Sequence, residues 1–284
     1  MIDVSFLHQL DRFNLIVRKR ITSSFQGPRL SKSYGRGLVF QDYREYVPGD
    51  DFRSIDWKVF ARTDQFYIRR YEEERNLTLH VLVDASASMN FGKHEKKFNY
   101  ASMIGLGFAY MALKNNERFV FSTFADKLMP YRPKKGVKQL VDVIHHVNQL
   151  KVEGKSNFNE CMNTYKKVIK TRSMIVVVSD FLFELDELKE ALYKYKRSQL
   201  VIVMVLDPVE KNLDMRGDLI LHDAESNNIL RTFISRRMRE NYKHLLGDHI
   251  ARIQAFCESI GAKFIVTYTD VPIFETFYQV LTGK

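Results

Sequence analysis

A short apolar stretch at residues 79–83 runs directly into the polar sequence Asp84-Ala85-Ser86-Ala87-Ser88. One carboxylate and two hydroxyls alternate along this segment, so an extended backbone places all three on the same side. Ligand sets made only of oxygen suit a hard divalent cation, Mg²⁺ or Mn²⁺. We therefore expect this segment to hold part of a metal site.

Two later loops offer more oxygen ligands. Ser156 lies just before a predicted helix, and Asp180 follows the apolar stretch at 174–179. Helix capping or turn formation would explain each of them alone. Ligands of open α/β sheets bind beyond the carboxyl ends of the strands, where these loops would meet. The expected metal residues are Asp84, Ser86, Ser88, Ser156 and Asp180. A further strand-end aspartate, Asp207, precedes a proline and is interpreted as a turn residue.

The elements that must position these residues alternate between strand and helix from residue 76 onward. Several of the apolar stretches are apolar on both faces, which is typical of a parallel sheet covered by helices on both sides. The pattern predicts an α/β fold with a doubly wound, mostly parallel sheet. Strands are expected at 79–83, 118–124, 174–179, 200–206 and 263–268, with a possible edge strand at 127–131 and a hairpin formed by 219–221 and 229–233. Helices are expected at 96–114, 137–150, 159–170, 186–195, 235–260 and 273–281.

Residues 1–75 read as a separate region that packs on a main domain of residues 76–284. Apolar residues at helical spacing from Phe6 to Ile21 predict an amphipathic helix, and an irregular or β arm follows it. Charged residues of the arm could pair among themselves, and we expect Trp57 to bury against the sheet edge. This favours a structural clamp, with a partner-binding surface as the alternative. The arm residues concerned are Arg44, Tyr46, Asp50, Arg53, Asp56 and Trp57.

Composition narrows the class of protein. The chain has 284 residues, of which 45% are hydrophobic and 27% charged, which allows a sizeable core and excludes wholesale disorder. Its two cysteines cannot build a disulfide framework or a cysteine-based zinc site. No apolar run reaches the roughly 18 residues of a membrane helix, so we expect no membrane span and a cytoplasmic location. The net charge of +10 raises nucleic acid as a partner, but the basic residues are dispersed without interleaved aromatics, which argues against it.

Two motifs resemble known families. The sequence Asp-Ala-Ser-Ala-Ser at 84–88 resembles the Asp-x-Ser-x-Ser motif of the von Willebrand factor A domain, whose fold carries a metal-ion-dependent adhesion site. This resemblance implies that Ser86 and Ser88 bind the metal directly and that Asp84 and Asp180 act through water or in support. Ser156 falls at the position of the family's threonine.

A second resemblance covers nearly the whole chain. The block from Arg44 to Lys58, with Gly49-Asp50 and Ile55-Asp56-Trp57, resembles a block that precedes a von Willebrand A-like domain in the bacterial family known as domain of unknown function 58. The segment 206–210 (Leu-Asp-Pro-Val-Glu) is also similar to that family. This resemblance implies a MoxR-type AAA+ ATPase as partner, in protein assembly or chaperoning.

Three functions compete at this point. The leading hypothesis is a non-catalytic interaction module whose metal captures an Asp or Glu side chain of a partner protein. The second is a Mg²⁺-dependent phosphohydrolase with Asp84 as nucleophile, although Ser86 stands where that chemistry wants a second aspartate. The third is nucleic-acid binding through the basic surface.

Overall fold

The computed structural model of the protein describes residues 6, 9–11, 39–72, 78–93, 95–130, 136–169, 173–215, 217–225 and 228–282. The chain divides into two units, an arm of residues 23–76 and a main unit of residues 1–22 and 77–284. Phe6 belongs to the main unit, with its ring 6.2 Å from that of Phe274. Most of the predicted N-terminal helix lies outside the described residues, and the packing of the arm on the main unit stays a prediction.

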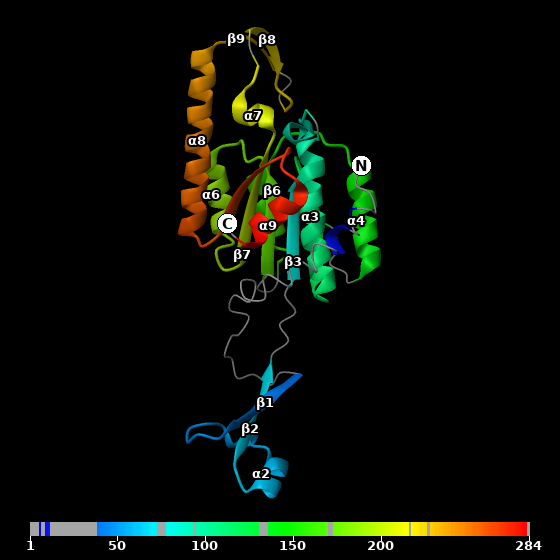
Figure 1. The fold of residues 1–284 in the computed structure, drawn as a ribbon, viewed down its shortest axis with the longest axis vertical. Helices are drawn as coiled ribbons and strands as arrows, with labels where there is room; N and C mark the ends of the chain where they lie inside the picture. The colour runs from blue at the N-terminus through cyan, green and yellow to red at the C-terminus, as the bar shows by residue number, and fades with distance from the viewer. Residues whose placement is uncertain are drawn as a thin grey trace. The chain divides into compact units, whose positions relative to one another are not determined.

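A six-stranded sheet lies at the centre of the main unit as the structure describes it (Figure 1). The strand order is β10-β7-β6-β3-β4-β5, and all neighbours are parallel except the short edge strand β5, which is antiparallel to β4. Strand β6 is buried along its whole length, as its continuous apolar sequence predicts. The bounds are β3 (Thr78–Asp84), β4 (Arg118–Phe124), β5 (Leu128–Pro130), β6 (Ser173–Ser179), β7 (Gln199–Leu206) and β10 (Lys263–Tyr268).

Helices cover both faces of this sheet (Figure 1), so the predicted α/β fold is confirmed. One face carries α3 (Lys97–Lys114), α4 (Val137–Gln149) and α9 (Ile273–Thr282). The other carries α5 (Phe158–Tyr165), α6 (Leu185–Tyr193) and α8 (Arg236–Ser259). Helix α5 ends earlier than the predicted Lys170, because the Val168 N–H bonds to the Tyr165 carbonyl only three residues back and tightens the chain into a turn.

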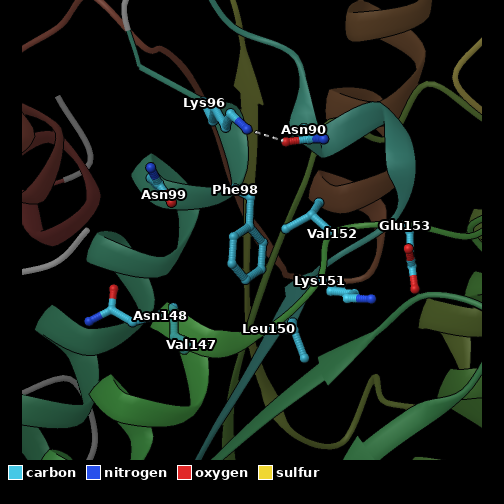
Figure 2. Close-up of a pocket in the computed structure, with 10 residues that line it drawn as sticks. All are labelled: Asn90, Lys96, Phe98, Asn99, Val147, Asn148, Leu150, Lys151, Val152 and Glu153. Carbon is cyan, nitrogen blue, oxygen red and sulfur yellow. Dashed lines mark hydrogen bonds between the residues drawn. The ribbon is translucent and has the colours of Figure 1, made fainter.

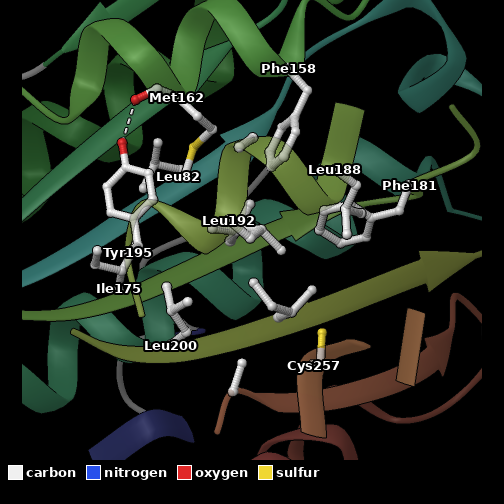
Figure 3. Close-up of a cluster of buried hydrophobic side chains, with 14 of the residues drawn as sticks. Leu82, Phe158, Met162, Ile175, Phe181, Leu188, Leu192, Tyr195, Leu200 and Cys257 are labelled. Atoms are coloured by element: carbon white, nitrogen blue, oxygen red, sulfur yellow. Dashed lines mark hydrogen bonds between the residues drawn. The ribbon is translucent and has the colours of Figure 1, made fainter. Parts of the chain in front are cut away.

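A hydrophobic core cluster lies between the sheet and helices α5, α6 and α8 (Figure 3). Alternate residues of the strands point into it, among them Leu82 and Ile175, and Phe158 and Leu192 meet them from the helices. The buried Tyr195 hydroxyl donates a hydrogen bond to the Met162 carbonyl. This packing holds the carboxyl ends of β3 and β6 side by side.

The opposite face depends on close contact between α3 and α9. A Cβ atom added at Gly107 of α3 would lie 1.8 Å from the Phe277 ring, which is buried. We expect Gly107→Ala to lower the free energy of unfolding by about 1–3 kcal/mol, because this ring has little room to move. Gly247→Ala is the matched control in α8, where a Cβ meets nothing within 4 Å. The control should gain up to about 1 kcal/mol in helix propensity. Equal effects of the two variants in urea denaturation would contradict the close contact.

Two smaller sheets complete the described parts. In the main unit, α7 (Pro208–Asn212) follows β7 and leads to a hairpin of β8 (Gly217–His222) and β9 (Ile229–Ile234), close to the predicted bounds. In the arm, β1 (Val39–Glu45) pairs with β2 (Tyr67–Glu72), and η1 (Phe52–Ser54) and α2 (Trp57–Thr63) lie between them in sequence. Within the described residues, no helix has the length and apolar character needed to cross a membrane.

Candidate metal centre

The carboxyl end of β3 places Asp84 at the centre of the candidate site. Its side chain is fully buried; Oδ1 accepts a hydrogen bond from the Ser86 N–H (2.9 Å) and Oδ2 accepts one from the Ser179 hydroxyl (2.6 Å). Burial, and then the charge of Asp180, raise the pKa of Asp84 to about 7 against the opposing effect of these hydrogen bonds. A positive charge nearby would offset both causes, so this carboxylate is well placed to hold a cation.

The two motif serines follow Asp84 at the start of a short 3₁₀ helix, η2 (Ala87–Asn90). Ser86 is its N-cap residue, with extended backbone angles of φ −64° and ψ 164°. The hydroxyls of Ser86 and Ser88 lie 3.1 Å apart. The structure therefore brings together the two hydroxyls that alternation along the sequence placed on one side.

The loop at residues 151–157 adds a third hydroxyl. The Ser156 hydroxyl donates to Asp84 Oδ2 over 3.4 Å. Gly154 fixes this loop, since its carbonyl accepts a hydrogen bond from the Ala87 N–H (2.9 Å) and its φ of +92° suits glycine. A Cβ at Gly154 would lie 2.6 Å from a carboxylate oxygen of Asp126. The third hydroxyl is thus held against the motif by backbone contact.

Asp180 lies at the end of β6, next to β3, but it already has a cationic partner. Its Oδ2 accepts a hydrogen bond from the Lys97 ammonium (2.8 Å), which also pairs with Glu210 of α7 (2.6 Å). The Lys97 side chain is completely buried. Burial lowers the pKa of Lys97, but the charges of the two carboxylates outweigh it and hold the pKa above its ordinary value. Asp180 therefore borders the hydroxyl cluster and shares one ammonium with Glu210.

The oxygen atoms gathered here fit a hard divalent cation. The Asp84 carboxylate and the hydroxyls of Ser86, Ser88 and Ser156 form one hydrogen-bonded cluster without nitrogen or sulfur ligands. In the part of the chain that the structure describes, no group of three or more His, Cys, Asp and Glu could hold a metal. A metal in this cluster would thus depend on hydroxyls, which leave most of its positive charge uncancelled.

Sequence reasoning missed three residues that shape the cluster. Ser179 donates to Asp84, while Lys97 pairs with Asp180 and Glu210 shares the same ammonium. Ser179 and Glu210 lie within segments that the sequence singled out, so their position was an available signal. No such signal marked Lys97, because a lysine in the first turn of a helix is normally solvated.

Asp207 has the local role predicted for it. Its Oδ1 accepts a hydrogen bond from the Val209 N–H (2.9 Å), and the Glu210 carboxylate accepts one from the Asp207 N–H (2.8 Å). The two bonds form a capping box at the start of α7. Glu210 therefore both caps α7 and binds Lys97.

A separate pocket of ≈ 500 Å³ lies between α3, α4 and the loop that follows α4 (Figure 2). Phe98, Val147 and Val152 line it, and Lys96 donates a hydrogen bond to Asn90 at its rim (2.7 Å). None of the five expected metal residues lines this pocket. The candidate centre lies at the strand ends, with Asp84 and Ser86 buried and Ser88 and Ser156 half-buried, and is not part of this cavity.

A family model described as "Protein of unknown function DUF58" matches residues 42–252. The chain belongs to the DUF58 family. The match covers about three quarters of the chain and includes the arm block as well as the Asp84 cluster. The predicted family is therefore confirmed, whereas an association with a MoxR-type ATPase stays a prediction.

Relatives of this DUF58 protein include uncharacterized mycobacterial proteins. An uncharacterized protein of Mycobacterium tuberculosis, Rv1480, is 25% identical over 267 residues, which span 92% of this chain and 84% of the relative. The chain is also similar in structure to the von Willebrand factor domain of the type V pilus tip protein Mfa5 from Porphyromonas gingivalis. That similarity has 11% identity and a TM-score of 0.33, over 72% of this chain and 86% of the other.

The predicted cytoplasmic location is wrong as an inference from the sequence. An aerotolerance-related membrane protein from Bacteroides fragilis has a similar structure, with 11% identity and a TM-score of 0.45, over 73% of this chain and all of the other. The lack of a long apolar helix in the described residues does not establish a cytoplasmic location.

The arm block of this DUF58 protein organises the arm itself. The Arg44 guanidinium bonds both carboxylate oxygens of Asp50 at 2.8 Å, which closes the turn between them. The Val47 N–H, together with Arg44, holds the pKa of Asp50 below its ordinary value. Asp56 caps α2 and accepts a hydrogen bond from the Tyr43 hydroxyl (2.9 Å).

The remaining arm residues contribute aromatic contacts more than charge pairs. The Tyr46 ring lies 5.2 Å from Phe52, and Trp57 packs edge-on against Phe66 at 6.3 Å. Trp57 is 58% exposed in the arm as described, and its burial against the sheet edge stays a prediction. Arg53 contributes its backbone N–H, which bonds to the Asp51 carboxylate at 2.9 Å. A structural role within the arm accounts for most of the block.

Proposed function

We propose that this DUF58 protein is a non-catalytic interaction module that holds Mg²⁺ or Mn²⁺ in the cluster of Asp84, Ser86, Ser88 and Ser156. The observation that supports it is the meeting of three hydroxyls from two loops around one buried carboxylate with a raised pKa. A metal bound mainly by hydroxyls keeps much of its charge and attracts a carboxylate from outside. Asp180, paired with the ammonium that Glu210 shares, would border the site outside the set of hydroxyl ligands.

The partner that suits such a site is a protein with an exposed Asp or Glu. A MoxR-type AAA+ ATPase, working with this protein in assembly or chaperoning, is the partner that we propose on the basis of family resemblance. A nucleophilic role for Asp84 is less well supported, because its side chain is fully buried and both oxygens accept hydrogen bonds.

Thermal unfolding against Mg²⁺ and Mn²⁺ concentration, after EDTA treatment, tests this function. We expect stabilisation of the wild type by about 2.7 kcal/mol when the metal is at a hundredfold excess over its Kd. Asp84→Asn and Ser88→Ala should lose most of this stabilisation, since each removes a ligand while leaving the local shape nearly intact.

A matched control is Ser259→Ala, which removes a hydroxyl that bonds the Phe256 carbonyl (2.6 Å) at the far end of α8. It should respond to metal like the wild type. The proposal fails if the wild type shows no metal-dependent shift, or if Asp84→Asn and Ser88→Ala shift as much as the control.

A further inference from the structure

The pocket between α3 and α4 shares two segments of its lining with the candidate metal centre (Figure 2). One is Asn90, the last residue of η2, which also carries Ser88. The other is residues 151–153, the start of the loop that supplies the third hydroxyl. A hydrogen bond from the Ala87 N–H to the Gly154 carbonyl (2.9 Å) joins the two segments. The same backbone therefore positions both the pocket and the hydroxyl cluster.

The chain itself limits the distance between the pocket and the hydroxyls. Consecutive Cα atoms lie about 3.8 Å apart, so the Cα atoms of Asn90 and Ser88 are at most about 8 Å apart, and those of Glu153 and Ser156 at most about 11 Å. In an extended peptide, side chains two positions apart point to the same side and lie about 7 Å from each other. An extended segment whose carboxylate reached the metal would therefore bring the side chain two positions away to this pocket.

The inner part of the pocket is apolar. The Phe98 ring, at the centre of the lining side chains in Figure 2, is buried, as is Val147 of α4. Leu150 and Val152 line the same space and are half-buried. The volume of ≈ 500 Å³ is that of an ordinary ligand site and has room for an apolar side chain with the backbone that carries it. Such a side chain would displace water from these apolar surfaces.

The rim of the pocket carries more positive than negative charge. Two exposed lysines, Lys96 and Lys151, line it together with one exposed glutamate, Glu153. The Lys96 ammonium donates a hydrogen bond to Asn90 (2.7 Å), and an ammonium can donate three. The rim therefore complements an acidic segment, which is also the kind of segment that a metal at the hydroxyl cluster would attract.

We propose that this pocket binds the partner segment on either side of its metal-bound carboxylate, an extended acidic segment with a large apolar residue two positions from the Asp or Glu. The metal takes the carboxylate, the pocket takes the apolar side chain over Phe98, and the lysines attract the rest of the segment. This inference rests on the proposed function and adds to it the sequence that the partner carries. A metal alone would accept any exposed carboxylate, whereas the pocket selects among them.

Three synthetic peptides test this pairing by titration calorimetry on the full chain with Mn²⁺. The first is Leu-Ser-Asp-Ser-Leu, which presents a leucine to the pocket in either chain direction. The second has serine in place of both leucines, and the third has asparagine in place of the aspartate. We expect the leucine peptide to bind at least about tenfold more tightly than the serine peptide, because it buries one leucine. The asparagine peptide should bind at least tenfold more weakly than the leucine peptide, and EDTA should weaken the leucine peptide as much.

Two variants separate recognition by the pocket from an effect on folding. Val152→Ser should weaken binding of the leucine peptide about three- to tenfold and leave the serine peptide unchanged, because the metal ligands stay in place. Lys151→Glu should weaken both peptides, and added salt should reduce that loss. The matched control is Val137→Ser, the same exchange at an exposed position of α4 that does not line the pocket, and it should bind both peptides like the wild type.

Equal binding of the leucine and serine peptides to the wild type, dependent on Mn²⁺ and lost in Asp84→Asn, would overturn this inference and leave the proposed function intact. Binding of the leucine peptide that persists in EDTA and in Asp84→Asn would also overturn it, because the pocket would then act without the metal. Self-association of the wild type that Val152→Ser abolishes would assign the pocket to a second copy of the chain instead. Failure of every peptide to bind in a metal-dependent manner would overturn both proposals.

Discussion

Lys97→Met is expected to lower the free energy of unfolding by about 3–5 kcal/mol, the largest effect of any single substitution considered for this protein. Methionine matches the volume of the lysine stem, so the loss comes from charge rather than from a cavity. Without the ammonium, Asp180 and Glu210 lose their shared partner at 2.8 and 2.6 Å, and both lie at a largely buried edge of the sheet. Urea denaturation at neutral pH measures this change.

Lys114→Met is the matched control, because it removes an ammonium from the same helix. Lys114 pairs with Asp11 at 2.7 Å, but the two side chains are 41% and 49% exposed. Exposed ion pairs contribute less than about 1 kcal/mol to the free energy of unfolding. Similar losses in the two variants would mean that the Lys97 pair is solvated. Adding Asp180→Asn to Lys97→Met should recover part of the stability, since one unpaired charge disappears.

A second large loss of stability is expected at low pH, and it comes from His80 in β3. Burial lowers the pKa of this imidazole to about 4, and its Nδ1 lies 2.8 Å from the Tyr165 hydroxyl. The unfolded chain binds the proton first, so the stabilising contribution of neutral His80 is present above pH 6.5. It is lost as the pH falls from 6.5 through about 4. At about 1.4 kcal/mol per pH unit, the loss amounts to roughly 3 kcal/mol.

The measurement compares the unfolding free energy of the wild type, as a function of pH, with that of His80→Asn. The asparagine amide oxygen can take the place of Nδ1. The raised pKa of Asp84 acts in the opposite direction, because the folded protein then holds a proton that the unfolded chain releases as the pH rises from about 4 to 7. Both proteins share that contribution, so the difference between their pH profiles isolates His80. Parallel profiles of unfolding free energy from pH 7.5 to 4.5 would contradict a buried, neutral His80.

Most of the fold could be predicted because its strands carry an unambiguous pattern. The stretches at 174–179 and 200–206 are apolar on both faces, which is rarely compatible with anything except a covered parallel strand. The ends of α5 were less predictable, since its polar residues up to Lys170 continue a helical pattern that the turn at Val168 interrupts.

The candidate site was predictable only where its residues are adjacent in sequence or end neighbouring strands. Asp84, Ser86 and Ser88 form a motif, and Ser156 and Asp180 follow from the strand order. Lys97 reaches the same place from the first turn of a helix, where sequence periodicity carries no information about direction. Its two partners, Asp180 and Glu210, come from other elements, and such pairings arise only in three dimensions.

The five-residue helix α7 has a consequence beyond the stability of its own turn. Glu210 ties it to Lys97, and Lys97 ties it in turn to Asp180 beside the metal centre. Two carboxylates thus share one ammonium, so a stronger ion pair of Lys97 with one carboxylate weakens its ion pair with the other. Any event that adds positive charge next to Asp180 frees Lys97 to hold α7 more tightly. Displacement of α7 weakens the ion pair of Lys97 with Glu210 and strengthens its ion pair with Asp180. By thermodynamic linkage, the coupling free energy is the same in both directions.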